Sequence, residues 1–165
     1  MPKDFNWSDD FSVGIEEIDE QHKKLVMLVG KLHQAITNKA GTKACGFILN
    51  ELVDYTVTHF SLEETMMRLA LYPDYEEHCV QHKALVDEVS ALQQKIAAGQ
   101  VAISFELLHF LRNWLTKHIM REDMQYGVYF RERERIRQEG VNDRAERSAG
   151  TENQPKKKRR WWKFW

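Results

Sequence analysis

The sequence is poor in residues that interrupt helices. Its 165 residues include three prolines and eight glycines, while hydrophobic residues make up 42% of the chain. Proline and glycine break helices and mark tight turns, so their scarcity favours long helices over many short strands. The apolar fraction is large enough to build a core, and the length fits one domain with an appendage.

Three further absences narrow the class of protein. No run of about 20 apolar residues exists, so we expect no transmembrane helix. The first residues, MPKDFNWSDD, lack the charged-then-apolar layout of a secretory signal. The two cysteines, Cys45 and Cys79, are too few for a disulfide framework. We therefore expect a cytoplasmic protein in a reducing compartment.

Positive charge is concentrated at one end of the chain. The net charge is −1, but the last ten residues, KKKRRWWKFW, hold six of the 24 basic side chains and no acidic one. The remaining 155 residues carry 18 basic and 25 acidic side chains, a net charge of −7. An acidic body and a basic tail therefore need separate explanations.

Apolar residues recur in steps of three and four through most of the body, which is the period of a helix with one buried face. After an extended arm over residues 1–17, we expect helices at about 19–38, 43–70 and 73–99. Ser104 can cap a fourth helix, which persists to about Gln138. Long helices with short turns predict an all-α, antiparallel up-down-up-down four-helix bundle. The expected organisation is a bundle at 1–138, a disordered linker at 139–155 and a tail at 156–165.

Histidine and carboxylate residues lie within these apolar stripes. His59 and Glu63 are four residues apart, as are His78 and His82, so each pair projects from one helix face. His22 lies in the stripe of the first helix and His118 in that of the fourth. A single histidine in such a stripe is more often a core residue satisfied by one hydrogen bond. Candidates on all four helices are better explained by a shared metal site, because imidazole and carboxylate suit iron or zinc.

The carboxylate of the fourth helix is ambiguous from spacing alone. Asp123 follows His118 by five residues, about 140° around an ideal helix, whereas Glu122 follows by four, about 40°. Helix geometry therefore favours Glu122. With either residue the set has seven members, too many for one tetrahedral or octahedral ion, so we expect two metals.

A carboxylate-rich ferritin-like centre fits poorly. That class uses two Glu-x-x-His motifs, and this chain has one, Glu106 to His109. We interpret His33 and His109 as surface or core residues and Cys79 as a packed thiol. Acceptors for the far ring nitrogens of the ligands include Glu16, Glu20 and Asp54.

Four stretches resemble hemerythrin, in its bacterial single-domain form: GIEEIDEQHKKL, HFSLEETMM, YEEHCVQH and LRNWLTKHIMREDMQY. The resemblance covers about residues 7–126, and it favours Asp123 over Glu122. It implies a non-haem di-iron site with an oxo or hydroxo bridge that binds O2 reversibly. By that analogy His78, His82 and His118 hold one iron. His22 and His59 hold the other, which keeps one open position, and Glu63 and Asp123 bridge the two.

Apolar residues flank the candidate ligands and could form the wall of an O2 pocket or serve only as core: Leu25, Phe60, Trp114, Leu115 and Ile119. No additional acid, Tyr or Cys is placed there by the sequence, so an O2 binder for storage, delivery or sensing is favoured over an enzyme. The alternatives are a di-iron oxidase or peroxidase, a scavenger of peroxide or nitric oxide, and a membrane-associated module that responds to O2 or redox state. We expect a monomer.

The tail joins basic and aromatic side chains: Lys156, Lys157, Lys158, Arg159, Arg160, Trp161, Trp162, Lys163, Phe164 and Trp165. Lys and Arg are attracted to anionic lipid, and Trp prefers the headgroup boundary. We therefore interpret the tail first as a peripheral anchor at the inner face of the membrane. Binding of a polyanion or of an acidic protein, or a non-native extension, are the alternatives. Nucleic acid is not an expected partner of the body.

Overall fold

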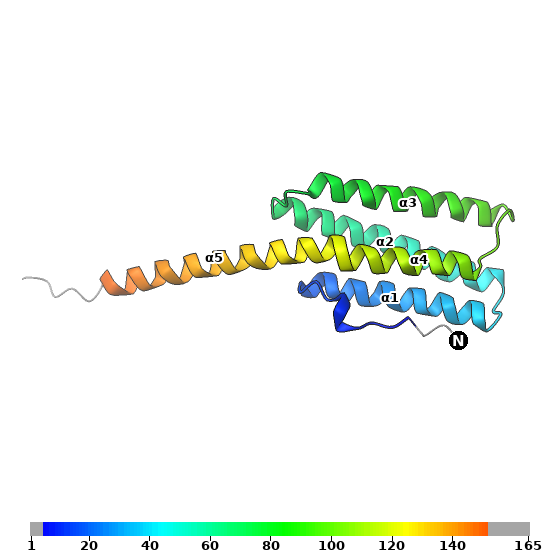
Figure 1. Cartoon of the computed structure of the whole chain (residues 1–165), viewed down its shortest axis with the longest axis horizontal. Coiled ribbons are helices and arrows are strands. Elements are labelled where there is room, and N and C mark those ends of the chain that lie inside the picture. The colour runs from blue at the N-terminus through cyan, green and yellow to red at the C-terminus, as the bar shows by residue number, and fades with distance from the viewer. Residues whose placement is uncertain (1–4, 152–165) are drawn as a thin grey trace, which may run out of the picture. The chain divides into compact units, whose positions relative to one another are not determined.

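The computed structural model describes residues 5–151, with side chains described to residue 146, and every regular element in that range is a helix (Figure 1). The predicted all-α four-helix bundle is confirmed. The elements in chain order are η1 (Asp9–Phe11), α1 (Glu16–Thr37), α2 (Thr42–Leu69), α3 (Tyr75–Ala97), α4 (Phe105–His118), the π-helical turn η2 (Ile119–Asp123) and α5 (Met124–Thr151).

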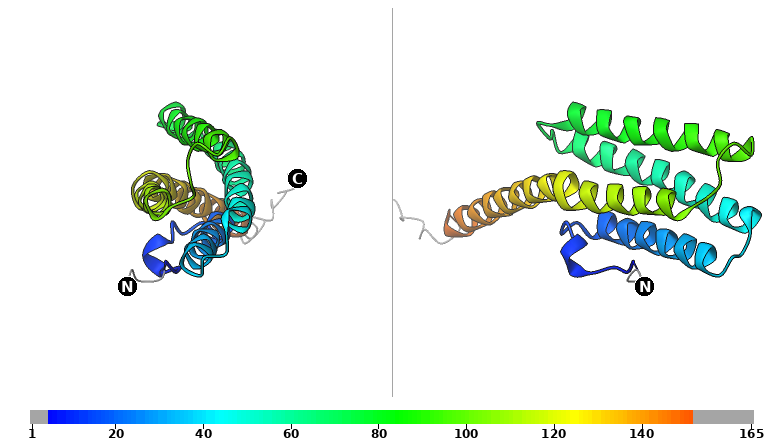
Figure 2. Two further views of the ribbon diagram at one scale, coloured as in Figure 1. Left: turned by 90° about the vertical axis from the view of Figure 1, so that its right-hand side faces the viewer. Right: turned by 45° about the vertical axis from the view of Figure 1, so that its right-hand side comes forward.

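Helices α1 to α4 alternate in direction, as Figures 1 and 2 show. Helix α1 packs against α2 and α4, and α2 also packs against α3. Between consecutive helices the chain reverses within a few residues, so the turns are short. Gly99, with a φ of +70°, ends α3 in the left-handed region that glycine adopts without strain. The side chain of Ser104 accepts a hydrogen bond from the Leu107 amide, so the predicted cap of α4 is confirmed.

The extended arm is fixed to the bundle by one carboxylate. Asp19 accepts hydrogen bonds from the Ser12 hydroxyl at 2.6 Å and from the Val13 amide at 2.7 Å. The carbonyl of Val13 accepts from Arg131, and it lies so near Gly127 that a Cβ there would collide with it. The arm is therefore held at a backbone contact that only glycine permits.

Helix α5 continues to Thr151, through most of the segment for which the Gly, Asn, Ser and Gln content predicts a disordered linker, residues 139–155. Side chains three or four residues apart pair along the earlier part of this helix: Arg135 with Glu132 and Glu139, and Arg137 with Glu134. Complementary charges on successive turns favour a helix as far as Glu139.

The chain divides into two compact units, one through Arg131 and one from Glu132 onward. Described residues of the second unit are exposed. No helix in the described range is long and apolar enough to cross a membrane. The predicted tail at 156–165 lies outside the described residues.

Candidate metal centre

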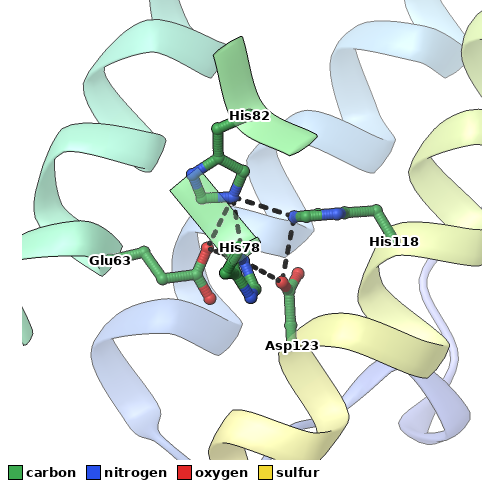
Figure 3. A group of neighbouring side chains, drawn as sticks. All are labelled: Glu63, His78, His82, His118 and Asp123. Atoms are coloured by element: carbon green, nitrogen blue, oxygen red, sulfur yellow. Dashed lines mark hydrogen bonds and ion pairs between the residues drawn. The ribbon is translucent and has the colours of Figure 1, made fainter. Parts of the chain in front are cut away.

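Side chains from α2, α3, α4 and η2 converge inside the bundle (Figure 3). Glu63, His78, His82, His118 and Asp123 each offer a ligand atom within 4.8 Å of the others. A second group at the same spacing joins His22 and His59 to Asp123. All seven predicted side chains therefore meet, and they form two groups that share one carboxylate.

The two oxygens of Asp123 face different histidines. Its Oδ2 lies 3.2 Å from Nε2 of His22, while its Oδ1 lies 3.0 Å from Nε2 of His118 and 3.3 Å from that of His78. A carboxylate that presents one oxygen to each group is placed to bridge two cations. The geometry therefore fits two metal ions better than one.

Glu63 lies between the same two groups. Its Oε2 is 3.8 Å from Nε2 of His59, on the same helix, and 3.6 Å and 3.4 Å from those of His78 and His82. The i, i+4 spacing of His59 and Glu63 thus brings both to one helix face, as predicted from the sequence. Glu63 is the second candidate for a bridging carboxylate.

The imidazole nitrogens are as close together as ligands of one ion. Nε2 of His82 lies 3.0 Å from Nε2 of His78 and 3.0 Å from Nε2 of His118. For metal–nitrogen bonds of about 2.1 Å, neighbouring ligand atoms of an octahedron are about 3.0 Å apart. The spacing therefore suits three histidines around one six-coordinate ion.

Burial supports the same conclusion. Among described residues, these seven make up the whole set of buried histidines and carboxylates, and none is more than 4% exposed. Both ring nitrogens of His22 and all four oxygens of Glu63 and Asp123 lack a hydrogen bond of good geometry. Buried polar atoms left unpaired are costly and rare. Cations between them would satisfy these atoms, so the residues present fit a metal centre.

The π-helical turn explains the spacing on the fourth helix. The amide of Met124 bonds to the carbonyl of Ile119, five residues earlier, so one extra residue is accommodated in this turn. Asp123 is thereby brought beneath His118, and its side chain is fully buried. Glu122 is only partly buried and lies outside both groups. The preference for Glu122 from ideal helix geometry is therefore wrong.

Opposite shifts in pKa show how the carboxylates act on the histidines. Burial lowers the pKa of His59 to about 4. Burial also opposes charge on His78, but the Asp123 and Glu63 carboxylates outweigh it and raise the pKa of His78 to about 10. Burial would raise the pKa of Glu63 too, yet contacts with His78 and His82 lower it. Without a metal, His78 therefore holds a proton that a metal ion would have to displace.

The acceptors for the far ring nitrogens are residues that sequence reasoning missed. His59 donates from Nδ1 to the Gln21 side chain at 3.0 Å, and His82 donates to Glu64 at 2.9 Å. Such bonds fix the ring orientation and make Nε2 the ligand atom. Glu16, Glu20 and Asp54 do not make these contacts. Each acceptor directly adjoins a predicted ligand, His22 or Glu63, and this adjacency was the available signal.

Tyr126 was also missed. Its ring is fully buried, and its hydroxyl has no hydrogen-bond partner among the described residues. Burial, and then the charge of Glu63, raise the pKa of this hydroxyl. No sequence pattern pointed to it, because a tyrosine at the end of an apolar stripe ordinarily packs its ring in the core while its hydroxyl reaches a partner or the surface.

Aromatic rings cover two of the histidines. Phe60 stacks on His82 with centroids 3.6 Å apart, and Trp114 stacks on His118 at 4.5 Å. Leu25, Trp114 and Leu115 line an apolar cavity of about 30 Å³ toward the middle of the bundle. Phe60 and Ile119 are buried but do not line this cavity. The predicted pocket wall therefore includes three residues beside the cavity and two packed elsewhere.

The remaining candidates lie outside the cluster. His33 meets the ring of Phe105 edge-on, and His109 hydrogen bonds with Asn113. Cys79 is a free, partly buried thiol. These positions agree with their interpretation as packing or surface residues.

Comparison with known proteins agrees with the geometry. Residues 13–129 match the family described as Hemerythrin HHE cation binding domain. The chain is 37% identical over 121 residues to a bacteriohemerythrin of Stenotrophomonas maltophilia (strain R551-3), covering 73% of this chain and 78% of that protein. A bacteriohemerythrin of Methylococcus capsulatus (strain ATCC 33009 / NCIMB 11132 / Bath) is 36% identical over 119 residues, or 72% and 89% of the two chains. A crystal structure of wild-type hemerythrin superposes with a TM-score of 0.71 at 34% identity, covering 74% of this chain and 94% of the other. The chain belongs to the hemerythrin family.

Proposed function

We propose that this protein binds O2 reversibly at a non-haem di-iron centre and serves oxygen storage, delivery or sensing. The observation that carries the proposal is the sharing of Asp123 by two groups of buried ligands. Proteins named bacteriohemerythrin are similar along most of the chain, which favours the same metal and the same ligand.

The ligands divide unequally between the two ions. His78, His82 and His118 would hold one iron, and His22 and His59 would hold the other, with Glu63 and Asp123 bridging. The second ion would then have one protein ligand fewer, which would leave a coordination position for a small molecule. Two ferrous ions would supply the two electrons that reversible O2 uptake requires.

The surrounding side chains would keep this position dry. The apolar cavity, which Trp114 connects to His118 by ring stacking, is lined almost wholly by aliphatic residues, with Thr56 and the Trp114 indole as its polar contributors. An apolar cavity of this kind excludes water and admits a small apolar gas. Exclusion of water and protons favours reversible binding over turnover, because release of reduced oxygen requires a proton donor.

Turnover as an oxidase or peroxidase, or scavenging of peroxide or nitric oxide, is the second candidate. The observation that favours it is Tyr126, whose buried hydroxyl has no partner and lies near enough to Glu63 to sense its charge. A phenol at this place could donate a proton. A pathway from solvent to resupply that proton would also be needed.

Anaerobic reconstitution with ferrous iron distinguishes the two candidates. We expect two irons per chain and an optical charge-transfer band that appears with O2 and disappears when O2 is removed, through repeated cycles. Irreversible oxidation at first exposure would contradict reversible binding and favour turnover. Binding of one iron or none would refute the di-iron centre.

We further propose that the tail, residues 156–165, binds anionic membranes. Its five consecutive basic residues and four aromatic ones support this by their chemistry. Co-sedimentation with anionic liposomes at low and high salt, with and without the tail, tests it. Equal sedimentation of both proteins would rule out the anchor.

A further inference from the structure

A second cavity adjoins the metal centre, and its character is opposite to that of the apolar one. It has a volume of about 290 Å³, and we call it the acidic vestibule. Three carboxylates, two amides, one imidazole and one phenol line it: Asp74, Glu77, Glu122, Gln81, Gln125, His78 and Tyr72. These residues come from the α2–α3 turn, α3, η2 and the first turn of α5. Oxygen ligands of this kind suit a hydrated divalent cation.

Among the described residues, no basic side chain neutralises the acids of the vestibule. No Lys or Arg lines it, and no described ion pair involves Asp74, Glu77 or Glu122. Burial, and then the charges of Asp74 and Glu122, raise the pKa of the Tyr72 phenol. The negative potential of these acids therefore extends to Tyr72. A concave site lined by one sign of charge concentrates ions of the other sign.

One imidazole separates the vestibule from the metal centre. His78 lines the vestibule, yet it is only 4% exposed and its Nε2 contacts His82, Glu63 and Asp123. Of the seven candidate ligands, His78 is therefore the one that borders the vestibule.

The π-helical turn connects the same two spaces. Adjacent residues of this turn face opposite ways: Glu122 lines the vestibule, and Asp123 belongs to both ligand groups. Carboxylates thus stand on both sides of this turn, one in the vestibule and one in the cluster.

The apolar cavity offers no such path. Its lining of Leu and Val side chains provides no oxygen to replace the water around an ion. Transfer of a charged group into apolar surroundings without replacement ligands is strongly unfavourable. A gas molecule and a cation therefore require different routes to the same centre.

We propose that the acidic vestibule is the route by which ferrous ions reach the metal centre, passing from Asp74, Glu77 and Glu122 to the cluster at His78. This inference rests on the proposed function, because it requires that the cluster hold iron. Gln81 and Gln125 contribute neutral oxygen atoms along the way.

Removal of the three charges tests the route. The full-length variant Asp74→Asn, Glu77→Gln, Glu122→Gln is compared with the wild type during anaerobic mixing with ferrous iron. Samples are quenched with a ferrous chelator at increasing times, and the iron retained by the protein is measured. We expect uptake about tenfold slower at low ionic strength, with a difference that shrinks as salt is added. The endpoint remains two irons per chain.

A matched control removes three exposed acids elsewhere: Asp54→Asn, Glu88→Gln and Asp143→Asn. This control has the same net charge as the vestibule variant. If the position of the acids matters, the control should take up iron at the wild-type rate. Gln125→Lys adds one positive charge inside the vestibule and should slow iron uptake. Gln94→Lys adds one positive charge outside it and should leave the uptake rate unchanged. Helical circular dichroism verifies that each variant is folded.

The outcomes separate the two proposals. Equal uptake rates for the vestibule variant and its control, with two irons bound in each, would overturn the route and leave the di-iron centre intact. A vestibule variant that ends with fewer irons would make these acids part of the centre, which also overturns their role as a route. Wild-type protein that retains no iron would refute both proposals.

Discussion

The two halves of the bundle interior are built from opposite kinds of side chain. The metal half holds the seven buried histidines and carboxylates. The aliphatic half lies seven to ten residues away along the same four helices, or roughly 10–15 Å, and includes Leu32, Leu49, Val89 and Leu108, all buried. Burial of aliphatic side chains stabilises the fold, whereas burial of unpaired polar atoms opposes it. One half therefore supplies the stability that allows the other to hold ligands in place.

The largest expected effect comes from removing a ligand in the metal half. His59→Ala or Glu63→Ala should lower the iron content below two per chain, because each removes a candidate ligand at 1% exposure or less. Metal analysis after anaerobic loading measures this. His33→Ala and His109→Ala are the controls, since both lie outside the cluster. Full iron content in the two ligand variants would refute the assigned site.

A cavity created in the aliphatic half should lower the stability of the fold and leave the iron content unchanged. Leu32→Ala should lower the free energy of unfolding by about 2–5 kcal/mol, because Leu32 is fully buried and its removal leaves a void. Denaturant titration measures the loss, and iron content should stay at two per chain. A comparable loss of iron would show that the two halves are not separable.

The pH dependence of the metal-free protein should report the metal half alone. The pKa of His78 is raised to about 10, so its contribution to stability is present below pH 6.5, the usual range of histidine, and is lost as the pH rises toward 10. The pKa of His59 is lowered to about 4, so the unfolded chain takes up a proton first and stability falls as the pH drops from 6.5 toward 4.

Denaturant titrations from pH 4 to pH 9 measure this dependence. The metal-free protein should be most stable near pH 6.5. The iron-loaded protein should lose more stability as the pH falls below 6.5, because its ligated imidazoles stay unprotonated while the unfolded chain takes up protons. Stability of the metal-free protein that rises steadily from pH 6.5 to 9 would contradict the shift assigned to His78.

The smallest expected effect concerns two tyrosine hydroxyls. Tyr126→Phe should leave the unfolding free energy of the metal-free protein nearly unchanged, because the hydroxyl has no partner to lose. Tyr129→Phe should cost about 1 kcal/mol, since that hydroxyl donates to the carbonyls of Ala70 and Leu71. A larger loss for Tyr126→Phe than for Tyr129→Phe would show that the Tyr126 hydroxyl is satisfied.

Much of the bundle was predictable because it depends on local periodicity. The stripes through His22, His59 and His82 predicted which faces turn inward, and the Ser104 cap and the Gly99 stop follow from backbone chemistry. The helical continuation to Thr151 was not predicted, because the composition of residues 139–155 suggested disorder.

The sequence by itself determined the helical faces and six of the seven candidate ligands, since both depend on residue type and on spacings within one helix. Only the tertiary structure decided three other features. The π-helical turn selects Asp123 over Glu122, Gln21 and Glu64 support the histidines, and a polar cavity borders His78 while a separate apolar cavity lies beside Trp114. Each of these depends on how one helix faces another or on an irregular turn, and no periodicity along a single helix encodes such relations.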